Sequence, residues 1–226
     1  MLNIAIDGHV GSGKSTLSKG LAKRLNLRVL DTGAIYRGIA CRFKAEGLEN
    51  HIDEGTINKF VEKLKVQVEF DGDLQRVIVD GVDYTPWLRK EETSVLTSKI
   101  SPFPKIREKV LDIQRDFAKK YDCVIEGRDI GTVVLPNADV KFFITASEKV
   151  RAQRRYDQIK NLPDSPSYDE ILKDLRMRDY QDEHRKIAPL KPAKDSIIMD
   201  TSEMTLEQTI EKCVQIIQET RKEKSC

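Results

Sequence analysis

Long apolar runs are absent from this sequence. No stretch approaches the roughly 18 apolar residues of a membrane span, and the first residues lack the charged-then-apolar pattern of a signal peptide. These absences argue against a membrane-embedded or secreted protein. We therefore expect a cytoplasmic protein with no membrane partner.

A dominant sign of charge is absent too. The 39 basic and 37 acidic residues leave a formal net charge of +2. Because so small an excess gives no overall field that would attract a polyanion, we expect no nucleic acid as a partner. Any cationic chemistry must be local.

Cysteine is scarce. Cys41, Cys123, Cys213 and Cys226 are far apart and form no C-x-x-C pair. This spacing argues against a zinc site or a disulfide framework. We expect reduced thiols, in the core or at the surface.

Internal repeats are also lacking. With 226 residues, 39% of them hydrophobic, the chain can bury a core of ordinary size. We predict one domain over residues 1–226, acting as a monomer.

The sequence does contain a complete phosphate-binding loop. Residues 8–15 read Gly-His-Val-Gly-Ser-Gly-Lys-Ser, which matches G-x-x-x-x-G-K-[ST]. An apolar strand precedes the loop, and Leu17, Leu21 and Leu25 recur on one helix face after it. In this motif the Lys14 ammonium contacts the β and γ phosphates, and the Ser15 hydroxyl can bind Mg²⁺. The motif in this context predicts a nucleoside triphosphate site.

Strands and helices alternate along most of the chain. This order predicts an α/β fold of the P-loop NTPase type, with a parallel sheet flanked by helices. Two helices near the C-terminal third begin after Ser147 and at about Tyr168, and a polar, proline-containing loop at 161–167 joins them. Ligands of such a fold bind at the carboxyl ends of the strands.

The pattern changes period between about residues 66 and 84. Apolar and polar residues alternate there up to two turn signals, Asp71-Gly72 and Asp80-Gly81. We predict a small three-stranded antiparallel insert, preceded by an amphipathic helix at about 54–65.

Arginines gather near the predicted strand ends and around the proline-containing loop. A phosphoryl transferase needs cations around the transferring group, although a single arginine is more often part of a solvated helix face. Arg151, Arg154 and Arg155 crowd one helix turn with Asp157 as the only nearby acid, so an anion would relieve their repulsion. The complete set is Arg37, Arg107, Arg128, Arg151, Arg154, Arg155, Arg178 and Arg185.

The Arg128-Asp129 pair lies between glycines and has two interpretations. It can be a salt bridge that holds the turn. It can also recognise cytosine, whose exocyclic amine donates to a carboxylate while O2 and N3 accept, whereas uracil presents the wrong group.

Four blocks of this sequence resemble the bacterial cytidylate kinase family, in its order. They are the strand Ile4–Gly8 with its loop, Leu30–Arg37, Gly127–Pro136 and Ile187–Ala193. The resemblance covers nearly the whole chain. It implies an enzyme of pyrimidine nucleotide metabolism that transfers the γ-phosphate of ATP to CMP or dCMP. It also implies an acceptor-binding region with the insert at about 36–104 and a helical lid at about 151–185.

The resemblance further implies roles for individual residues. Thr32, Arg107 and Asp129 would face the cytosine ring, and Ser98, Arg178 and Asp182 the sugar. Arg37, Arg128 and Arg185 would bind the acceptor phosphate. Lys14, Arg128, Arg155 and Arg185 would be catalytic through their charge, with no general base needed. ATP phosphates and Mg²⁺ would be held by Gly8, His9, Val10, Gly11, Ser12, Gly13, Lys14, Ser15 and Thr16, with Ser15 as the metal ligand.

Four positions depart from the pattern of the family. His9 stands where proline is usual, Thr32 where serine, Glu126 where aspartate and Gln181 where arginine is common. None of these changes removes an indispensable charge.

Two other functions are compatible with a phosphate-binding loop. A kinase for another acceptor, such as adenylate, thymidylate or shikimate, would show acceptor motifs that this chain lacks. A nucleotide-gated binding ATPase would hydrolyse ATP without stimulation by a monophosphate and leaves the arginines unexplained. A GTP switch is disfavoured because the chain has no N-K-x-D guanine motif.

Overall fold

The computed structural model describes residues 1–163 and 165–225, so Asp164 in the predicted 161–167 loop and the predicted thiol of Cys226 lie outside the described residues. The chain forms two compact units, residues 1–29 with 121–226 and residues 30–120. The second unit includes all of residues 36–104, the predicted acceptor-binding region.

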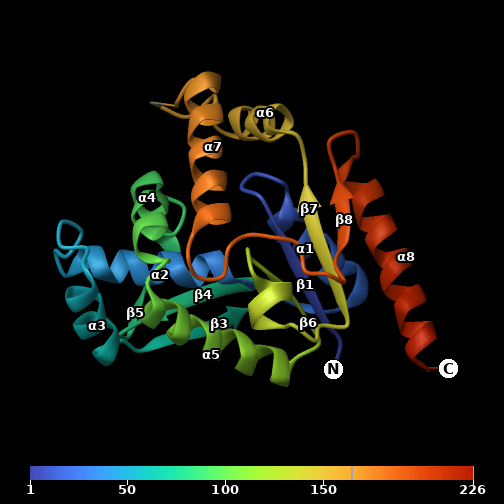
Figure 1. Cartoon of the computed structure of the whole chain (residues 1–226), viewed down its shortest axis with the longest axis horizontal. Coiled ribbons are helices and arrows are strands. Elements are labelled where there is room, and N and C mark those ends of the chain that lie inside the picture. Colours follow the sequence, from blue (N-terminus) through green and yellow to red (C-terminus); the bar gives the residue numbers. More distant parts are fainter. Residues whose placement is uncertain (164, 226) are drawn as a thin grey trace. The chain divides into compact units, whose positions relative to one another are not determined.

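The first unit is built on a parallel sheet, as the sequence predicts. The strand order is β2-β6-β1-β7-β8, and β1 pairs with both β6 and β7. Figure 1 labels β1, β6, β7 and β8 of this sheet. The strands are β1 (Asn3–Gly8), β2 (Arg28–Asp31), which crosses into the second unit, β6 (Cys123–Glu126), β7 (Val140–Thr145) and β8 (Ile197–Asp200). Because these strands are parallel, their carboxyl ends meet at one edge.

Helices α1 (Lys14–Leu25) and α8 (Leu206–Ser225) pack on this sheet. Leu17 and Leu21 of α1 and Ile210 of α8 join Ile6 and Phe142 of the strands in one buried cluster. The predicted leucine face of the helix after the phosphate loop therefore does cover the sheet. This packing fixes the N-terminus of α1, which directly follows the phosphate loop.

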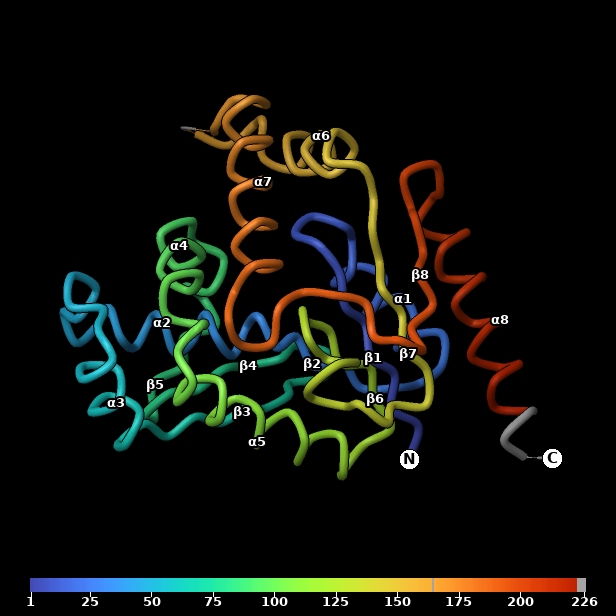
Figure 2. Tube along the Cα trace, in the orientation of Figure 1, coloured from blue at the N-terminus to red at the C-terminus, as the bar shows by residue number. Residues whose placement is uncertain are grey.

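The predicted lid at about 151–185 comprises most of α6 (Glu148–Ile159) and all of α7 (Tyr168–His184), the two helices labelled in Figure 2. Ser147 caps α6, since its hydroxyl accepts from the Val150 amide, and Ser167 caps α7 through a capping box with Glu170. Both predicted helix starts are confirmed. Ala152, Ile171 and Leu175 form a small apolar core between the two helices.

The second unit contains the predicted antiparallel insert. Its sheet is β3 (Val66–Asp71), β4 (Leu74–Val79) and β5 (Val82–Asp83), with Val66 opposite Val79. Asp80 and Gly81 both have positive φ, as a tight hairpin turn requires. The prediction from alternating residues and turn signals is confirmed.

Helices surround this small sheet in the second unit. They are α2 (Thr32–Ala45), α3 (Glu54–Lys63), the short 3-10 helix η1 (Thr85–Trp87), α4 (Glu91–Ile100) and α5 (Pro104–Lys120). Gly38 lets α2 approach β4 closely, because a Cβ at this position would lie 2.4 Å from Val77 Cγ1. Phe43 and Phe60 meet edge to face in the buried core between α2 and α3.

Candidate active site

The phosphate loop connects β1 to α1. Gly8 ends β1 with a φ of +145°, and a Cβ there would lie 1.9 Å from the carbonyl oxygen of Ile144 on β7. Gly13, with a φ of 90°, precedes the first residue of α1. A side chain larger than hydrogen therefore does not fit at Gly8. The backbone amides at the N-terminus of α1 form the kind of site that binds an anion.

Lys14 is buried within this loop. Its Nζ donates to the His9 carbonyl at 2.6 Å and lies 3.4 Å from Ser12 Oγ. Burial, with repulsion from Arg128, lowers the Lys14 pKa from 10.5 to about 7. The ammonium is therefore poorly solvated, and a polyphosphate would stabilise its charge.

Ser15 faces a carboxylate that the sequence analysis did not assign to the site. Its hydroxyl donates to Glu126 Oε2 at 2.8 Å, from the carboxyl end of β6. Glu126 is 4% exposed. A hydroxyl beside a carboxylate is the hard oxygen set that Mg²⁺ prefers. The position of Glu126 at a strand end was the signal that could have revealed it.

Asp7 organises the segment that follows Arg128-Asp129. Its two carboxylate oxygens accept from the amides of Ile130 and Gly131 at 2.8 and 2.7 Å. These amides belong to the first two residues of η2 (Ile130–Val134), a short π-helix. Burial raises the Asp7 pKa from 3.8 to about 6, despite these two hydrogen bonds.

The raised Asp7 pKa has a consequence for stability. Between about pH 4 and 6, Asp7 is still protonated in the folded protein but already ionised in the unfolded chain. The contribution of Asp7 to the free energy of unfolding therefore falls as pH rises through that window. Asp7→Asn has no such proton. We expect its unfolding free energy, relative to wild type, to rise by about 2 kcal/mol from pH 4.5 to 7.5 in urea titrations. A pH-independent difference would contradict the pKa shift.

Four predicted acceptor residues meet in one network of charges. Arg128 Nε donates to Asp182 Oδ2 at 2.7 Å, and Arg185 Nη2 donates to Asp129 Oδ1 at 3.1 Å. Arg185 Nη1 lies 3.9 Å from Asp182 Oδ1, which links the two pairs. Since Arg128 also repels Lys14, this cluster lies in the electrostatic field of the phosphate loop.

This network bears on the two interpretations of Arg128-Asp129. The two residues do not pair with each other in the contacts above; each pairs with a residue of α7 or its C-terminal end. Asp129 is 6% exposed. The ion pairs of Arg128 and Asp129 thus connect this loop to α7 and to Arg185 after it.

The lid arginines differ in their surroundings. Arg155 is exposed on α6, and Arg178 Nε lies 2.9 Å from Asp174 Oδ2 on its own helix. Arg154 donates to the carbonyl of Thr201 at 2.7 Å. Arg151 is buried and pairs with Asp179 Oδ2 at 2.6 Å. The crowding of these arginines is thus relieved partly within the protein, by an acid of α7 that the sequence analysis did not consider.

The remaining predicted residues belong to the second unit. Thr32 is buried in the first turn of α2, and Arg37 Nη2 donates to Asp31 Oδ2 at 2.8 Å. Among the described residues, buried Arg37 Nε finds no hydrogen-bond partner. Arg107 lies 5.9 Å from the centroid of the Tyr36 ring. The hydroxyl of Ser98 donates to the Ser94 carbonyl within α4.

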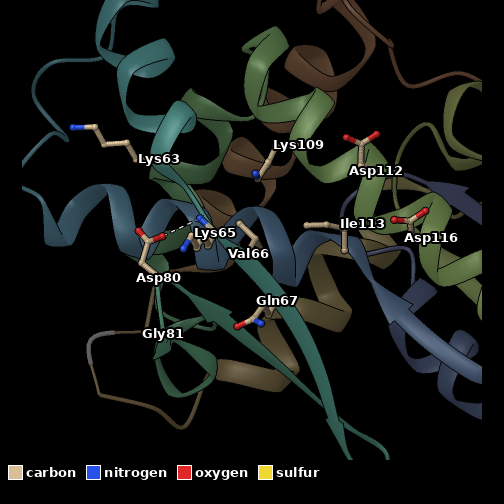
Figure 3. A pocket seen from close by; sticks show the side chains of 10 residues that line it. All are labelled: Lys63, Lys65, Val66, Gln67, Asp80, Gly81, Lys109, Asp112, Ile113 and Asp116. Carbon is tan, nitrogen blue, oxygen red and sulfur yellow. Dashed lines mark hydrogen bonds between the residues drawn. The ribbon is translucent and has the colours of Figure 1, made fainter.

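The second unit also has a pocket of about 890 Å³. Residues of α3, β3, the turn after β4 and α5 line it, and Figure 3 shows Lys65 beside Asp80, whose carboxylate accepts from the Lys65 amide at 2.9 Å. None of its lining residues is a predicted site residue. This pocket therefore contributes nothing to the candidate active site.

Comparison with known sequences decides the family. The profile described as cytidylate kinase matches residues 4–219. The chain belongs to the cytidylate kinase family. A cytidylate kinase of Thermotoga neapolitana is 40% identical over 219 residues, covering 97% of this chain and 98% of the relative. One from Caldicellulosiruptor saccharolyticus is 38% identical over 218 residues, with 95% of each chain covered. The cytidylate kinase family consists of nucleoside monophosphate kinases, so the prediction of such an enzyme is confirmed.

Solved structures agree on the fold. A shikimate kinase from Bacteroides thetaiotaomicron is 14% identical, with a TM-score of 0.51 over 96% of this chain and 98% of that chain. An uncharacterized protein from Eubacterium ventriosum is 12% identical, with a TM-score of 0.52 over 96% and 99%. At such identities the likeness concerns the fold alone, which is the predicted P-loop kinase type.

No helix in residues 1–163 and 165–225 combines the length and the apolar character needed to cross a membrane. Within the same residues, no three or more His, Cys, Asp or Glu side chains are grouped as a metal site. A Mg²⁺ ion bound mainly by nucleotide phosphates and water needs no such group.

Proposed function

We propose that this protein transfers the γ-phosphate of ATP to CMP or dCMP, giving ADP and CDP or dCDP. Membership of the cytidylate kinase family supports the reaction. The observation that carries its assignment to residues is the network of Arg128, Asp182, Asp129 and Arg185 in the field of Lys14. The predicted cytoplasmic location, the monomeric state and the single-domain organisation stay predictions.

The phosphate loop would hold the donor. Amides at the N-terminus of α1 and the Lys14 ammonium would bind the phosphates of ATP. Residues Gly8, His9, Val10, Gly11, Ser12, Gly13, Lys14, Ser15 and Thr16 form this loop. Ser15 and Glu126 would hold Mg²⁺, which, when bound, neutralises charge on the phosphates.

The acceptor would be bound by charges that are now paired with each other. A monophosphate can replace the Asp182 carboxylate at Arg128, and the cytosine amine can donate to Asp129. Arg185 would contact both base and phosphate, and Arg178 and Asp182 the sugar. In the second unit, Thr32 and Arg107 would contact the base and Ser98 the sugar. Arg37 would contact the acceptor phosphate, whose oxygen would accept from Nε, an atom with no hydrogen-bond partner among the described residues.

The chemical step needs positioning and charge rather than a base. The acceptor phosphate oxygen is already an anionic nucleophile, so no residue has to remove a proton. Lys14, Arg128, Arg185 and the exposed Arg155 of the lid would neutralise charge on the transferring group. In-line transfer would follow from the fixed positions of donor and acceptor.

The first test separates a kinase from a binding ATPase. ADP release from Mg²⁺-ATP is measured with and without CMP. We expect release to increase many-fold with CMP or dCMP, with one CDP or dCDP formed for each ADP. Equal ADP release in the absence of any monophosphate would overturn the proposal in favour of the ATPase.

Asp129 is expected to determine the preference for cytosine. Asp129→Asn keeps the shape of the side chain but removes the charged acceptor for the exocyclic amine. We expect the preference for CMP over UMP, measured as the ratio of kcat/KM values, to fall by about 1–3 kcal/mol, or roughly 5- to 150-fold. An unchanged ratio would refute the role of Asp129 in base recognition.

Glu126 is expected to determine the need for metal. Glu126→Gln retains an acceptor for the Ser15 hydroxyl but loses the negative charge. We expect the Mg²⁺ concentration for half-maximal activity to rise roughly tenfold or more, because the site loses a negative charge that favours the cation. The KM for CMP should stay near its wild-type value, and an unchanged Mg²⁺ titration would exclude Glu126 from the metal site.

A further inference from the structure

The outer part of the phosphate loop is bound to the lid helices. The carbonyl of Val10 accepts from Arg151 Nη1 of α6 at 2.9 Å, and the Val10 amide donates to Asp179 Oδ1 of α7 at 3.3 Å. Arg151 Nη1 also donates to Asp179 Oδ2 at 2.6 Å. One ion pair thus connects three segments that are far apart in the sequence.

This ion pair is buried. The side chains of Arg151 and Asp179 are 4% and 11% exposed. Arg151 Nε also donates to the carbonyl of Ala146 at 2.9 Å, directly after β7. Most polar atoms of the pair are therefore satisfied, and breaking the pair from one side would leave an uncompensated charge in the interior.

Packing around the ion pair includes the same part of the loop. The Val10 side chain packs against the small core of Ala152, Ile171 and Leu175. At Gly11 an added Cβ would lie 3.5 Å from Arg151 Cβ. The two helices thus contact this part of the loop in three ways: by hydrogen bonds to the Val10 backbone, by packing on the Val10 side chain, and by close approach at Gly11.

We infer that Arg151 and Asp179 are positioning residues for phosphoryl transfer, whose ion pair fixes the phosphate loop to both lid helices. This inference rests on the proposed kinase function. Because Val10 lies four residues before Lys14, an error in its position displaces the triphosphate relative to the charges of the lid. A displacement of about 1 Å can cost roughly 100-fold in rate.

A purely structural role would be shared by other contacts between α6 and α7. Arg176 Nε lies 2.8 Å from Glu148 Oε2 across the same two helices, and both side chains are about half exposed. This outer pair makes no contact with the loop among its hydrogen bonds in the described residues. It offers a matched control.

A second, more exposed contact also joins the loop to α7. His9 Nε2 lies 2.9 Å from Glu183 Oε1, and the Glu183 side chain is 42% exposed. Water screens such a pair, so it contributes little to the position of the loop. The buried pair is the one to test.

The test compares two double variants of the full chain. Arg151→Met with Asp179→Leu replaces the buried pair by apolar groups, so that neither charge is left in the interior without its partner. Arg176→Met with Glu148→Leu makes the same chemical change at the outer pair. Melting temperature, kcat, and KM for ATP and for CMP are measured for both and for wild type.

We expect the buried variant to lose roughly 10- to 100-fold in kcat and to raise the KM for ATP, with the KM for CMP within about threefold. The outer variant should match wild type. Equal kinetics of the two variants, or an effect confined to the KM for CMP, would overturn the inference.

A conservative variant covers the case of an unfolded protein. Arg151→Lys keeps the buried charge but loses the planar guanidinium, whose separate Nε and Nη1 atoms reach Ala146 and, from Nη1, Val10 and Asp179. It should show the same loss in kcat with a raised KM for ATP, and wild-type kinetics would overturn the inference. Failure of the proposed function is separate, because it would appear as a wild-type protein without CMP-dependent transfer.

Discussion

Arg128→Ala is expected to lower kcat for transfer to CMP by roughly 10³- to 10⁵-fold, the range for an arginine that stabilises a transferring phosphoryl group. In the structure its guanidinium pairs with Asp182 at 2.7 Å, and its charge acts on the ammonium of Lys14. The residue thus lies between the phosphate loop and the proposed acceptor residues. The measurement is steady-state kinetics with CMP and Mg²⁺-ATP.

Two controls distinguish the loss of the Arg128 charge from a loss of folding. Without Arg128, Asp182 still has Arg185 Nη1 at 3.9 Å, so we expect the melting temperature to change little. Arg128→Lys keeps the charge but loses the planar fork and should recover only part of the activity. An Arg128→Ala protein with kcat within tenfold of wild type would contradict the role.

Lys14→Met is expected to affect activity and stability in opposite directions. Loss of one preorganised charge on the phosphates should lower kcat by roughly 10²- to 10³-fold. The Lys14 ammonium is buried and its pKa is lowered to about 7, so its removal relieves a cost of burial. We expect the melting temperature at pH 6 to be equal to or above that of wild type.

Lys23→Met gives the matched comparison, because Lys23 is an exposed residue of the same helix. Its activity and melting temperature should equal those of wild type. A Lys14→Met protein that is both inactive and strongly destabilised would mean that Lys14 mainly supports the fold. Full activity would remove Lys14 from the site.

Much of the fold could be predicted because short, local sequence patterns determine it. The glycines and Lys14 of the phosphate loop lie next to one another in sequence, and the leucines of α1 repeat at helical spacing. The turn at Asp80-Gly81 needs positive φ, which few residues other than glycine, asparagine and aspartate adopt readily. In each case the residues that determine the structure lie within a few positions of each other.

The missed contacts join residues that are far apart in the chain. Ser15 meets Glu126, 111 positions away, and Arg151 meets Asp179, 28 positions away. Contacts between residues separated by so many positions leave no periodic pattern in the sequence. Sequence proximity indicates only Asp157 beside the crowded arginines, whereas the buried acid that pairs with Arg151 belongs to the next helix. Tertiary packing, rather than helical spacing, selects this partner.

The most direct test offers a mixture of CMP, dCMP, UMP, AMP and TMP at equal concentrations with Mg²⁺-ATP. The diphosphates formed at early times are separated and quantified by chromatography. The proposed function predicts that CDP and dCDP together equal the ADP formed from ATP, with little UDP or TDP. Predominant formation of UDP or TDP among the pyrimidine diphosphates, or ADP in large excess over all pyrimidine diphosphates, would contradict it.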